Sequence, residues 1–365
     1  MVETMVEKIE TVLTLQGGGS LGAYECGVYK AIAKHKIKLD IIAGTSIGSV
    51  NAVIIAGSKN DEPAKVLEDF WLSLADTVTS SYLPDKARAV ASVTHASIWG
   101  NKAFTPRWLS PNVPDSNNSP YLYDNVLLRN KINEYVDFEK IRRPTSPRII
   151  ITCTDIQNGK PTIFDSKYDN ITADHILASA GYPYYGIQWT KIGGKYLWDG
   201  TLLSNTPLID AINASPDSDK NVYLVDLFPH VQEELPKNME EVWHRARDIM
   251  FFDKVEHTLR VSNMLKRYLE LLGNMHEIMM NYLDSGKADD TMKRKISEIE
   301  KTYHKLTVER GGIIRDIVRV ERKEDAPYLF EDSDFSIATI KKLIRNGEDD
   351  AKKAIDSHLK KGSYG

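Results

Sequence analysis

A serine that could act as a nucleophile stands between two glycines, in the Gly-x-Ser-x-Gly pattern of Gly44, Ser46 and Gly48. The pattern follows the apolar run Leu39–Ala43 and precedes a small-residue helical pattern over Val50–Gly57. This order predicts a strand, a tight turn with a strained central residue, and a helix whose N-terminus favours a developing negative charge. We therefore interpret Ser46 as a nucleophile on an elbow. A plain Gly/Ser-rich turn is the alternative, because the pattern also recurs by chance.

A run of three glycines, Gly17, Gly18 and Gly19, forms a second turn that could bind a negative charge. It follows the β-branched run Thr11–Leu15 and precedes a helical pattern over Ala23–Lys34, so its backbone N–H groups can form an anion nest. No Gly-Lys-Ser/Thr follows, and the acidic residue of a dinucleotide-binding fingerprint is absent at the end of the second strand. We therefore interpret this turn as an oxyanion hole for acyl transfer.

The base that such a serine needs is not a recognisable histidine. Nine histidines occur in the sequence, and none belongs to a motif. An α/β-hydrolase triad does not suit the chain, because that fold places its nucleophile after several strands and Ser46 ends only the second predicted strand. The remaining candidate is Asp199 in an Asp-Gly turn, with Trp198 and Leu202 as an apolar wall that would raise its proton affinity. An ordinary structural turn is the alternative.

The elements that must position these residues alternate between strand and helix at the start of the chain, which predicts βαβ units and a parallel sheet. Ligands bind beyond the carboxyl ends of such strands, so both turns would face one pocket. Pro84–Tyr123 is expected to be a long surface excursion that borders the pocket or packs as an ordinary loop. Further helices are expected at 63–75, 125–135 and 174–180, strands at 148–154, 162–164 and 222–228, and a hairpin at 192–196.

The composition changes after about Pro236, so we expect a catalytic domain over residues 9–235 and a helical extension over 236–365. Apolar residues at helical spacing predict a long amphipathic helix or a broken helical pair over Val242–Leu283. The β-rich run Ile313–Val320 predicts a strand that returns to the main sheet. Two further helices are expected at 292–308 and 336–359.

The Met-rich stripes of this extension allow three interpretations. Amphipathic helices usually cover their own domain, and packing within the chain is the favoured one. Docking on a membrane surface and association with a second subunit, which would make a homo-oligomer, are the alternatives.

Composition excludes several other classes of protein. The chain has 365 residues, 42% hydrophobic and 27% charged, with a formal net charge of -4, so nucleic acid is not an expected partner. Two cysteines, Cys26 and Cys153, suggest neither a disulfide framework nor a metal site. No signal peptide pattern and no apolar run of about 20 residues occurs. The expected location is the cytoplasm, with peripheral membrane contact left open.

The motifs Gly17–Tyr24, Gly44–Ala52, Asp199–Gly200 and Asn205–Pro207 together resemble those of the patatin-like phospholipase family, in the same order. The resemblance covers about residues 9–210, and the tail is similar to that of bacterial members with an uncharacterised C-terminal extension. It implies a three-layer α/β/α fold with a central, mostly parallel sheet, followed by a helical extension.

The resemblance also implies roles for the site residues. Ser46 and Asp199 would form a catalytic dyad without histidine, and Gly17, Gly18 and Gly19 would supply the oxyanion donors, with no cofactor or metal. Leu21 stands where many members of the family have Arg or Lys, so the resemblance does not imply that a positive charge assists the oxyanion or binds a lipid phosphate here.

The activity implied is hydrolysis of an acyl ester with an apolar chain, such as a phospholipid, a lysophospholipid or a neutral lipid. An intracellular polyester depolymerase or a general carboxylesterase would use the same residues. A non-catalytic protein that binds a lipid or a partner would keep the fold and would not react with a fluorophosphonate probe.

Overall fold

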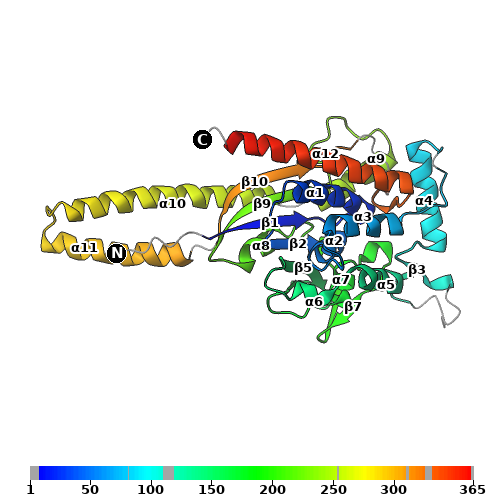
Figure 1. The fold of residues 1–365 in the computed structure, drawn as a ribbon, viewed down its shortest axis with the longest axis horizontal. Helices are drawn as coiled ribbons and strands as arrows, with labels where there is room; N and C mark the ends of the chain where they lie inside the picture. The colour runs from blue at the N-terminus through cyan, green and yellow to red at the C-terminus, as the bar shows by residue number, and fades with distance from the viewer. Residues whose placement is uncertain are drawn as a thin grey trace.

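A mixed sheet runs through the protein in the computed structural model, which describes residues 8–80, 82–109, 119–252, 255–309, 312–324 and 331–362. Within these residues the sheet has eight strands: β1 (Ile9–Leu15), β2 (Ile41–Thr45), β5 (Arg148–Asp155), β6 (Pro161–Asp165), β7 (Thr190–Ile192), β8 (Lys195–Asp199), β9 (Asp219–Asp226) and β10 (Ile314–Glu321). Their order is β10-β9-β1-β2-β5-β8-β7, with β6 also paired to β5 (Figure 1). Two short strands, β3 (Thr105–Pro106) and β4 (Tyr123–Asp124), pair separately.

The strand register brings the predicted site residues together at the carboxyl ends of β1 and β2. Strands β10, β9, β1, β2 and β5 run parallel, whereas β6 and β8 are antiparallel to β5. Leu15 lies opposite Gly44, so the glycine-rich turn and the serine turn leave the sheet side by side. Cys153 on β5 lies opposite Asp199, although β8 runs the other way. The parallel sheet predicted from the alternation of elements is confirmed.

Helices cover both faces of the sheet. The helices are α1 (Gly22–Lys34), α2 (Ile47–Ala56), α3 (Pro63–Leu74), α4 (Asp85–Trp99), α5 (Val126–Tyr135), α6 (Phe138–Ile141), α7 (Ala173–Ser179), α8 (Leu208–Ala214), α9 (Met239–Phe251), α10 (Val255–Asp284), α11 (Asp290–Glu309) and α12 (Ile337–Gly362). Alternate strand residues enter two cores, because successive side chains of a strand point to opposite faces. Leu13 and Ile42 join the larger core with α1, α2, α3 and α12, whereas Val12 and Ile41 join a smaller core with α8.

The region 84–123 differs from the expected irregular excursion, because it contains the 15-residue helix α4. This helix is rich in alanine, which favours a helix. Its buried residues, Arg88, Ala89 and Ser92, are either small or polar, so the sequence carries little apolar periodicity there. Gly100, with a φ of 79°, ends the helix. Composition alone therefore did not predict this helix, which borders the site.

The C-terminal segment contributes to the main body as well as projecting from it. Strand β10 pairs in parallel with β9, with Val318 opposite Tyr223. Helix α12 lies along α1 in close contact, since a Cβ on Gly27 would stand 2.0 Å from the carbonyl oxygen of Ile344. In contrast, α10 and α11 form a long hairpin that extends away from the sheet (Figure 1). The boundary at residue 235 remains a prediction.

The long apolar pattern Val242–Leu283 forms two helices, α9 and α10. Of the two expected alternatives, the broken helical pair is therefore the one that the structure shows. Among the described residues, no helix combines the length and the apolar character that crossing a membrane requires.

Candidate active site

Ser46 occupies a strained turn between β2 and α2. Its φ of 55° and ψ of −124° lie in a region that residues with a side chain seldom adopt. A Cβ on Gly44 would stand 2.4 Å from the backbone of Gly48, and a Cβ on Gly48 would stand 2.5 Å from the carbonyl oxygen of Leu15. The backbone N–H of Ser46 donates to Ser179 Oγ at 2.9 Å. Only glycine fits at positions 44 and 48, two residues before and two residues after the serine, which is the geometry of a nucleophile elbow.

Asp199 is fully buried where β8 ends, beside the serine turn. Its Oδ1 accepts a hydrogen bond from the backbone N–H of Thr201 at 2.8 Å. Within the part of the chain that the structure describes, Oδ2 has no hydrogen-bond partner. Burial raises the pKa of Asp199 to about 6, and the nearby hydroxyl of Ser46 opposes that rise. A carboxylate with increased proton affinity therefore lies next to the strained serine.

Trp198 and Leu202 were expected to form an apolar wall for Asp199, and neither side chain lines the pocket in front of Asp199. Trp198 precedes Asp199 on β8, and adjacent residues of a strand point to opposite faces. Desolvation of Asp199 comes instead from its position inside the sheet, where Thr154 Oγ1 donates to its carbonyl oxygen at 2.9 Å.

The glycine-rich turn lies directly beside Ser46. A Cβ on Gly17 would stand 2.9 Å from the Cβ of Ser46, so the close approach requires glycine. The N–H of Gly17 donates to the carbonyl oxygen of Asn205 at 3.4 Å. The N–H groups of Gly18 and Gly19 form no hydrogen bond with any other described residue, and Gly19 has a φ of 54°. Two backbone donors are therefore available near the serine.

A buried polar network that the motifs did not indicate anchors this turn. The N–H of Gln16 donates to Glu25 Oε1 at 2.7 Å, and its side chain donates to Thr206 Oγ1 at 2.7 Å. Glu25 also accepts from Asn51 Nδ2 at 2.8 Å, and burial raises the pKa of Glu25 to about 8. Since Asn51 belongs to α2, Glu25 connects the glycine-rich turn to the helix behind Ser46. The residues of this network are scattered singly along the sequence, so no motif predicted their contacts.

A mostly apolar pocket of about 330 Å³ opens in front of these residues. Ser46, Asp199 and the glycine-rich turn lie on its wall, and no histidine belongs to the described lining. Its apolar walls come from α3, α4, α5 and the segments that flank them: Leu74, Val93, Ala96, Ala103, Phe104, Leu122 and Leu128. A second group, mostly aromatic and polar, lines the pocket from later parts of the chain: Tyr182, Tyr184, Tyr185, Ile187, Phe251, Asp332, Ser333 and Phe335.

The C-terminal segment closes one side of this pocket through the short turn Glu331–Ser333. Ser20 Oγ donates to the carbonyl oxygen of Glu331 at 3.0 Å, beside the glycine-rich turn. Asp332 accepts from the Tyr185 hydroxyl at 2.6 Å and from Arg247 at 3.2 Å. Sequence reasoning did not place this turn at the site, because nothing local in the sequence indicates a contact between chain segments so far apart.

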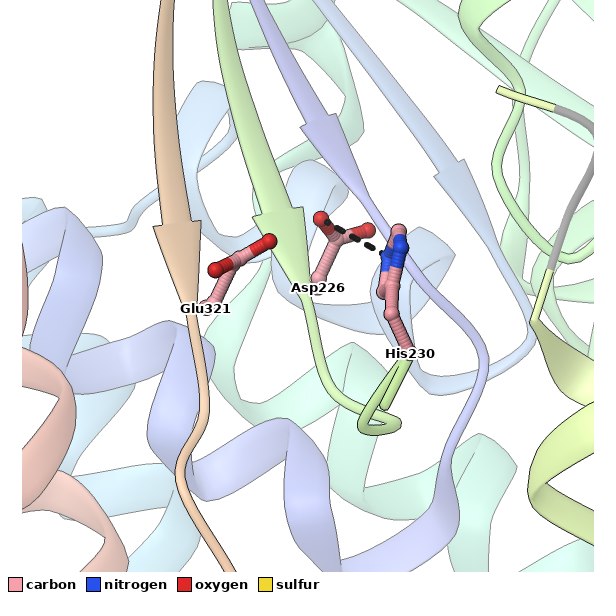
Figure 2. A group of neighbouring side chains, drawn as sticks. All are labelled: Asp226, His230 and Glu321. Atoms are coloured by element: carbon pink, nitrogen blue, oxygen red, sulfur yellow. Dashed lines mark ion pairs between the residues drawn. The ribbon is translucent and has the colours of Figure 1, made fainter. Parts of the chain in front are cut away.

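Two acidic clusters near the site could suggest a metal. Figure 2 shows Asp226 and His230 facing one another, with Glu321 on the neighbouring strand. Nε2 of His230 lies 3.6 Å from Oδ2 of Asp226. The guanidinium of Arg319 already pairs with Asp226 and lies 3.2 Å from Glu321. Gln16 donates to the other oxygen of Asp226 at 3.2 Å. These carboxylates therefore already pair with a cation of the chain itself, the Arg319 guanidinium.

The second cluster holds α9 against the turn Glu331–Ser333. His244 lies 2.8 Å from Glu324 and 3.6 Å from Glu331. Although burial opposes it, these two carboxylates raise the pKa of His244 to about 9. Arg247 pairs with Glu331 at 3.1 Å and with Asp248 at 2.8 Å. Arg322 pairs with Glu331 as well, at 2.7 Å. Protonated His244, Arg247 and Arg322 are thus the cations that pair with these carboxylates, so the cluster is an ion-pair network of the chain itself.

Comparison with known proteins gives a family match and several relatives. A sequence model of the family described as patatin-like phospholipase matches residues 13–212. The cGAMP-activated phospholipase of Escherichia coli is 26% identical over 217 residues, which cover 54% of this chain and 53% of that protein. The triacylglycerol lipase SDP1L of Arabidopsis thaliana is 39% identical over 74 residues, 20% of this chain and 9% of that protein. The chain thus spans about half the length of the bacterial relative and far less of the plant one.

Among solved structures, VipD from Legionella pneumophila aligns over 96% of this chain and 67% of that chain, with 11% sequence identity and a TM-score of 0.38. The family model matches more than half of the chain, because residues 13–212 make up more than half of the 365 residues. The chain belongs to the patatin-like phospholipase family.

Proposed function

We propose that this protein hydrolyses acyl esters of lipids, with Ser46 as nucleophile and Asp199 as base. The observation that carries the proposal is a buried carboxylate of raised pKa beside a strained serine, at the wall of an apolar pocket. Asp199 takes the proton of Ser46 as the hydroxyl oxygen attacks the ester carbonyl. It then returns that proton to the leaving alcohol. A water deprotonated by Asp199 finally releases the fatty acid and regenerates Ser46.

The tetrahedral oxyanion would be held by Gly18 and Gly19, whose N–H groups have no other described partner. Gly17 has a different task in this proposal. Its N–H donates to Asn205, and its lack of a side chain leaves room for Ser46. The N-terminus of α2 adds a positive dipole end below the reacting centre.

The lining of the pocket favours an acyl chain over a polar substituent. Its walls along α3, α4 and α5 are made of aliphatic and phenyl side chains such as Leu74, Val93 and Phe104. Burying each methylene of a fatty chain there gives about 0.8 kcal/mol. The relatives are in keeping with this substrate class, because their names, a phospholipase and a triacylglycerol lipase, describe hydrolysis of fatty-acyl esters.

Delivery of such a substrate would take place at a lipid surface, in peripheral contact with the mouth of the pocket. Large apolar side chains gather there: Trp108 donates its indole N–H to the carbonyl oxygen of Ile98 at 3.0 Å, and its ring lies 5.5 Å from that of Tyr123. Trp99 is 62% exposed at the end of α4, and the pocket-lining Tyr184 is 77% exposed. Aromatic side chains of this kind suit the interface between water and lipid.

The experiment that tests the activity compares wild type with Ser46→Ala on phospholipid vesicles and on a series of soluble esters of increasing chain length. We expect hydrolysis and labelling by a fluorophosphonate probe in wild type, and neither in Ser46→Ala. Ser97→Ala is the matched control, since Ser97 lines the same pocket on α4 without facing the glycine-rich turn. A folded Ser46→Ala protein that keeps its hydrolysis contradicts the proposal. Preference for short soluble esters would favour a general carboxylesterase.

The lipid contact is tested by Trp99→Ser and Trp108→Ser. We expect a loss of vesicle hydrolysis with little change on a soluble short-chain ester. Tyr168→Ser is the control, because Tyr168 is 74% exposed but lies beside Arg148, at the start of β5 and therefore at the opposite end of the parallel strands from Ser46. Equal losses on both kinds of substrate would contradict the lipid contact and indicate a damaged pocket.

A further inference from the structure

The hairpin of α10 and α11 packs through one face of α10 and leaves another uncovered. His276 stacks on Tyr303 of α11, with ring centroids 4.2 Å apart and an angle of 13° between the rings. Gly273, one turn earlier, also faces Tyr303, because a Cβ there would stand 3.8 Å from the phenolic oxygen. This side of α10 therefore forms the contact within the hairpin.

The uncovered side of α10 carries large apolar residues at a strict spacing of seven. These exposed residues form three series, which we call the heptad face: Met264, Leu271 and Ile278; Tyr268, Met275 and Tyr282; Leu265 and Leu272. Residues seven apart lie on one side of a helix, with a drift of about 20° per heptad that a left-handed supercoil removes. Helix α11 repeats the pattern in Met292, Ile299 and Leu306, which are exposed as well.

From this pattern we propose that the heptad face binds the heptad face of a second copy of this chain, as a coiled coil. A repeat of 3.5 residues is what knobs-into-holes packing between helices requires. A lipid surface needs an apolar side but no such register, and helices that lie on membranes are rich in Lys and Arg. Helix α10 instead has three Lys/Arg and four Asp/Glu residues. The proposal is independent of the hydrolysis proposed above.

The exposed charges of α10 lie off the heptad face. Glu270 and Glu277 are three and four residues from Gly273, so they lie on the side of the helix that faces α11. Pairing through the heptad face therefore leaves these carboxylates outside the interface, as the apolar core of an interface requires.

The area of the heptad face is sufficient for a stable pair. If each of the eight residues loses about 75 Å², half of a large side chain, each copy buries roughly 600 Å². The pair then buries about 1,200 Å², the lower end of the range for specific interfaces, before any contribution from α11. Two-fold pairing through one patch is also the commonest form of homo-oligomer.

Sedimentation of the full chain at micromolar concentration tests the association. We expect wild type to be a dimer, and the double variant Leu271→Glu/Ile278→Glu to dissociate at least about a hundredfold more readily, because carboxylates would be buried in the interface. Asn274→Glu, which adds a charge on the same helix outside the heptad face, should remain a dimer. Circular dichroism and ester hydrolysis report whether each variant is folded. A monomeric wild type, or a dimer that the double variant leaves unchanged, overturns the proposal.

Vesicle binding distinguishes a second copy of the chain from a lipid surface. Wild type that remains monomeric but binds vesicles through the same face would overturn the dimer in favour of a lipid surface.

Discussion

Asp332 lies against Gly19 so closely that a Cβ on the glycine would stand 2.1 Å from the aspartate's carbonyl oxygen. The two residues come from opposite ends of the chain. Gly19 belongs to the turn that would stabilise an oxyanion, and Asp332 belongs to the C-terminal turn that lines the pocket. The candidate site is therefore built by both parts of the chain, although its motifs all lie before residue 236.

A first prediction follows for Gly19→Ala. The backbone there has a φ of 54°, which costs a residue with a side chain about 1–2 kcal/mol, and the new methyl group must also displace Asp332. Gly159→Ala is the matched control, because Gly159 has a φ of 66° with nothing within 4 Å of the added Cβ. We expect both variants to lose stability in urea unfolding and only Gly19→Ala to lose at least tenfold in kcat/KM. Equal activity of the two would show that the contact with Asp332 does not matter.

A second prediction concerns the pH dependence of hydrolysis. Because Asp199 must be ionised to act as a base and burial raises its pKa to about 6, kcat/KM should rise with pH and level off above that value. Asp199→Asn should lose several orders of magnitude in rate, since an amide cannot take the proton. His175→Ala, which lies outside the pocket lining, should keep most of the activity. A histidine variant as inactive as Asp199→Asn would replace the dyad with a triad.

The same pKa gives a third prediction, for stability. A folded-state pKa of about 6 against an unfolded value of 3.8 means that the folded protein binds this proton more tightly. The stabilisation is complete below about pH 4 and is lost as pH rises through about 6, by about 3 kcal/mol at 1.36 kcal/mol per pKa unit. The stability of Asp199→Asn relative to wild type should therefore be higher at pH 8 than at pH 4. Urea unfolding of both proteins at the two pH values measures it, and an unchanged difference would contradict the shifted pKa.

Much of the fold was predictable because short apolar runs and glycine-rich turns are local signals. The register of Leu15 opposite Gly44 then follows from parallel pairing, and it places the two turns side by side. The turn at Asp332 was not predictable, since its position depends on packing between distant segments. Helix α4 was missed for another reason. Its buried side chains, Ala89 and Ser92 among them, are either small or polar, so no apolar period marks the helix.

The last prediction concerns a fragment of residues 1–236, which we expect to be insoluble and inactive. Without the C-terminal segment, β9 becomes an exposed sheet edge, because β10 pairs along it from Ile314 to Glu321. The face of α1 that contacts α12 is uncovered too, and Phe251 and Asp332 are lost from the pocket wall. A shortened full chain that lacks only the projecting hairpin, residues 264–306 replaced by a short Gly/Ser linker, is the control and should stay soluble with hydrolysis retained. Expression yield, solubility and hydrolysis of a short-chain ester distinguish the two, and a soluble, active 1–236 fragment would show that the tail is a separate addition.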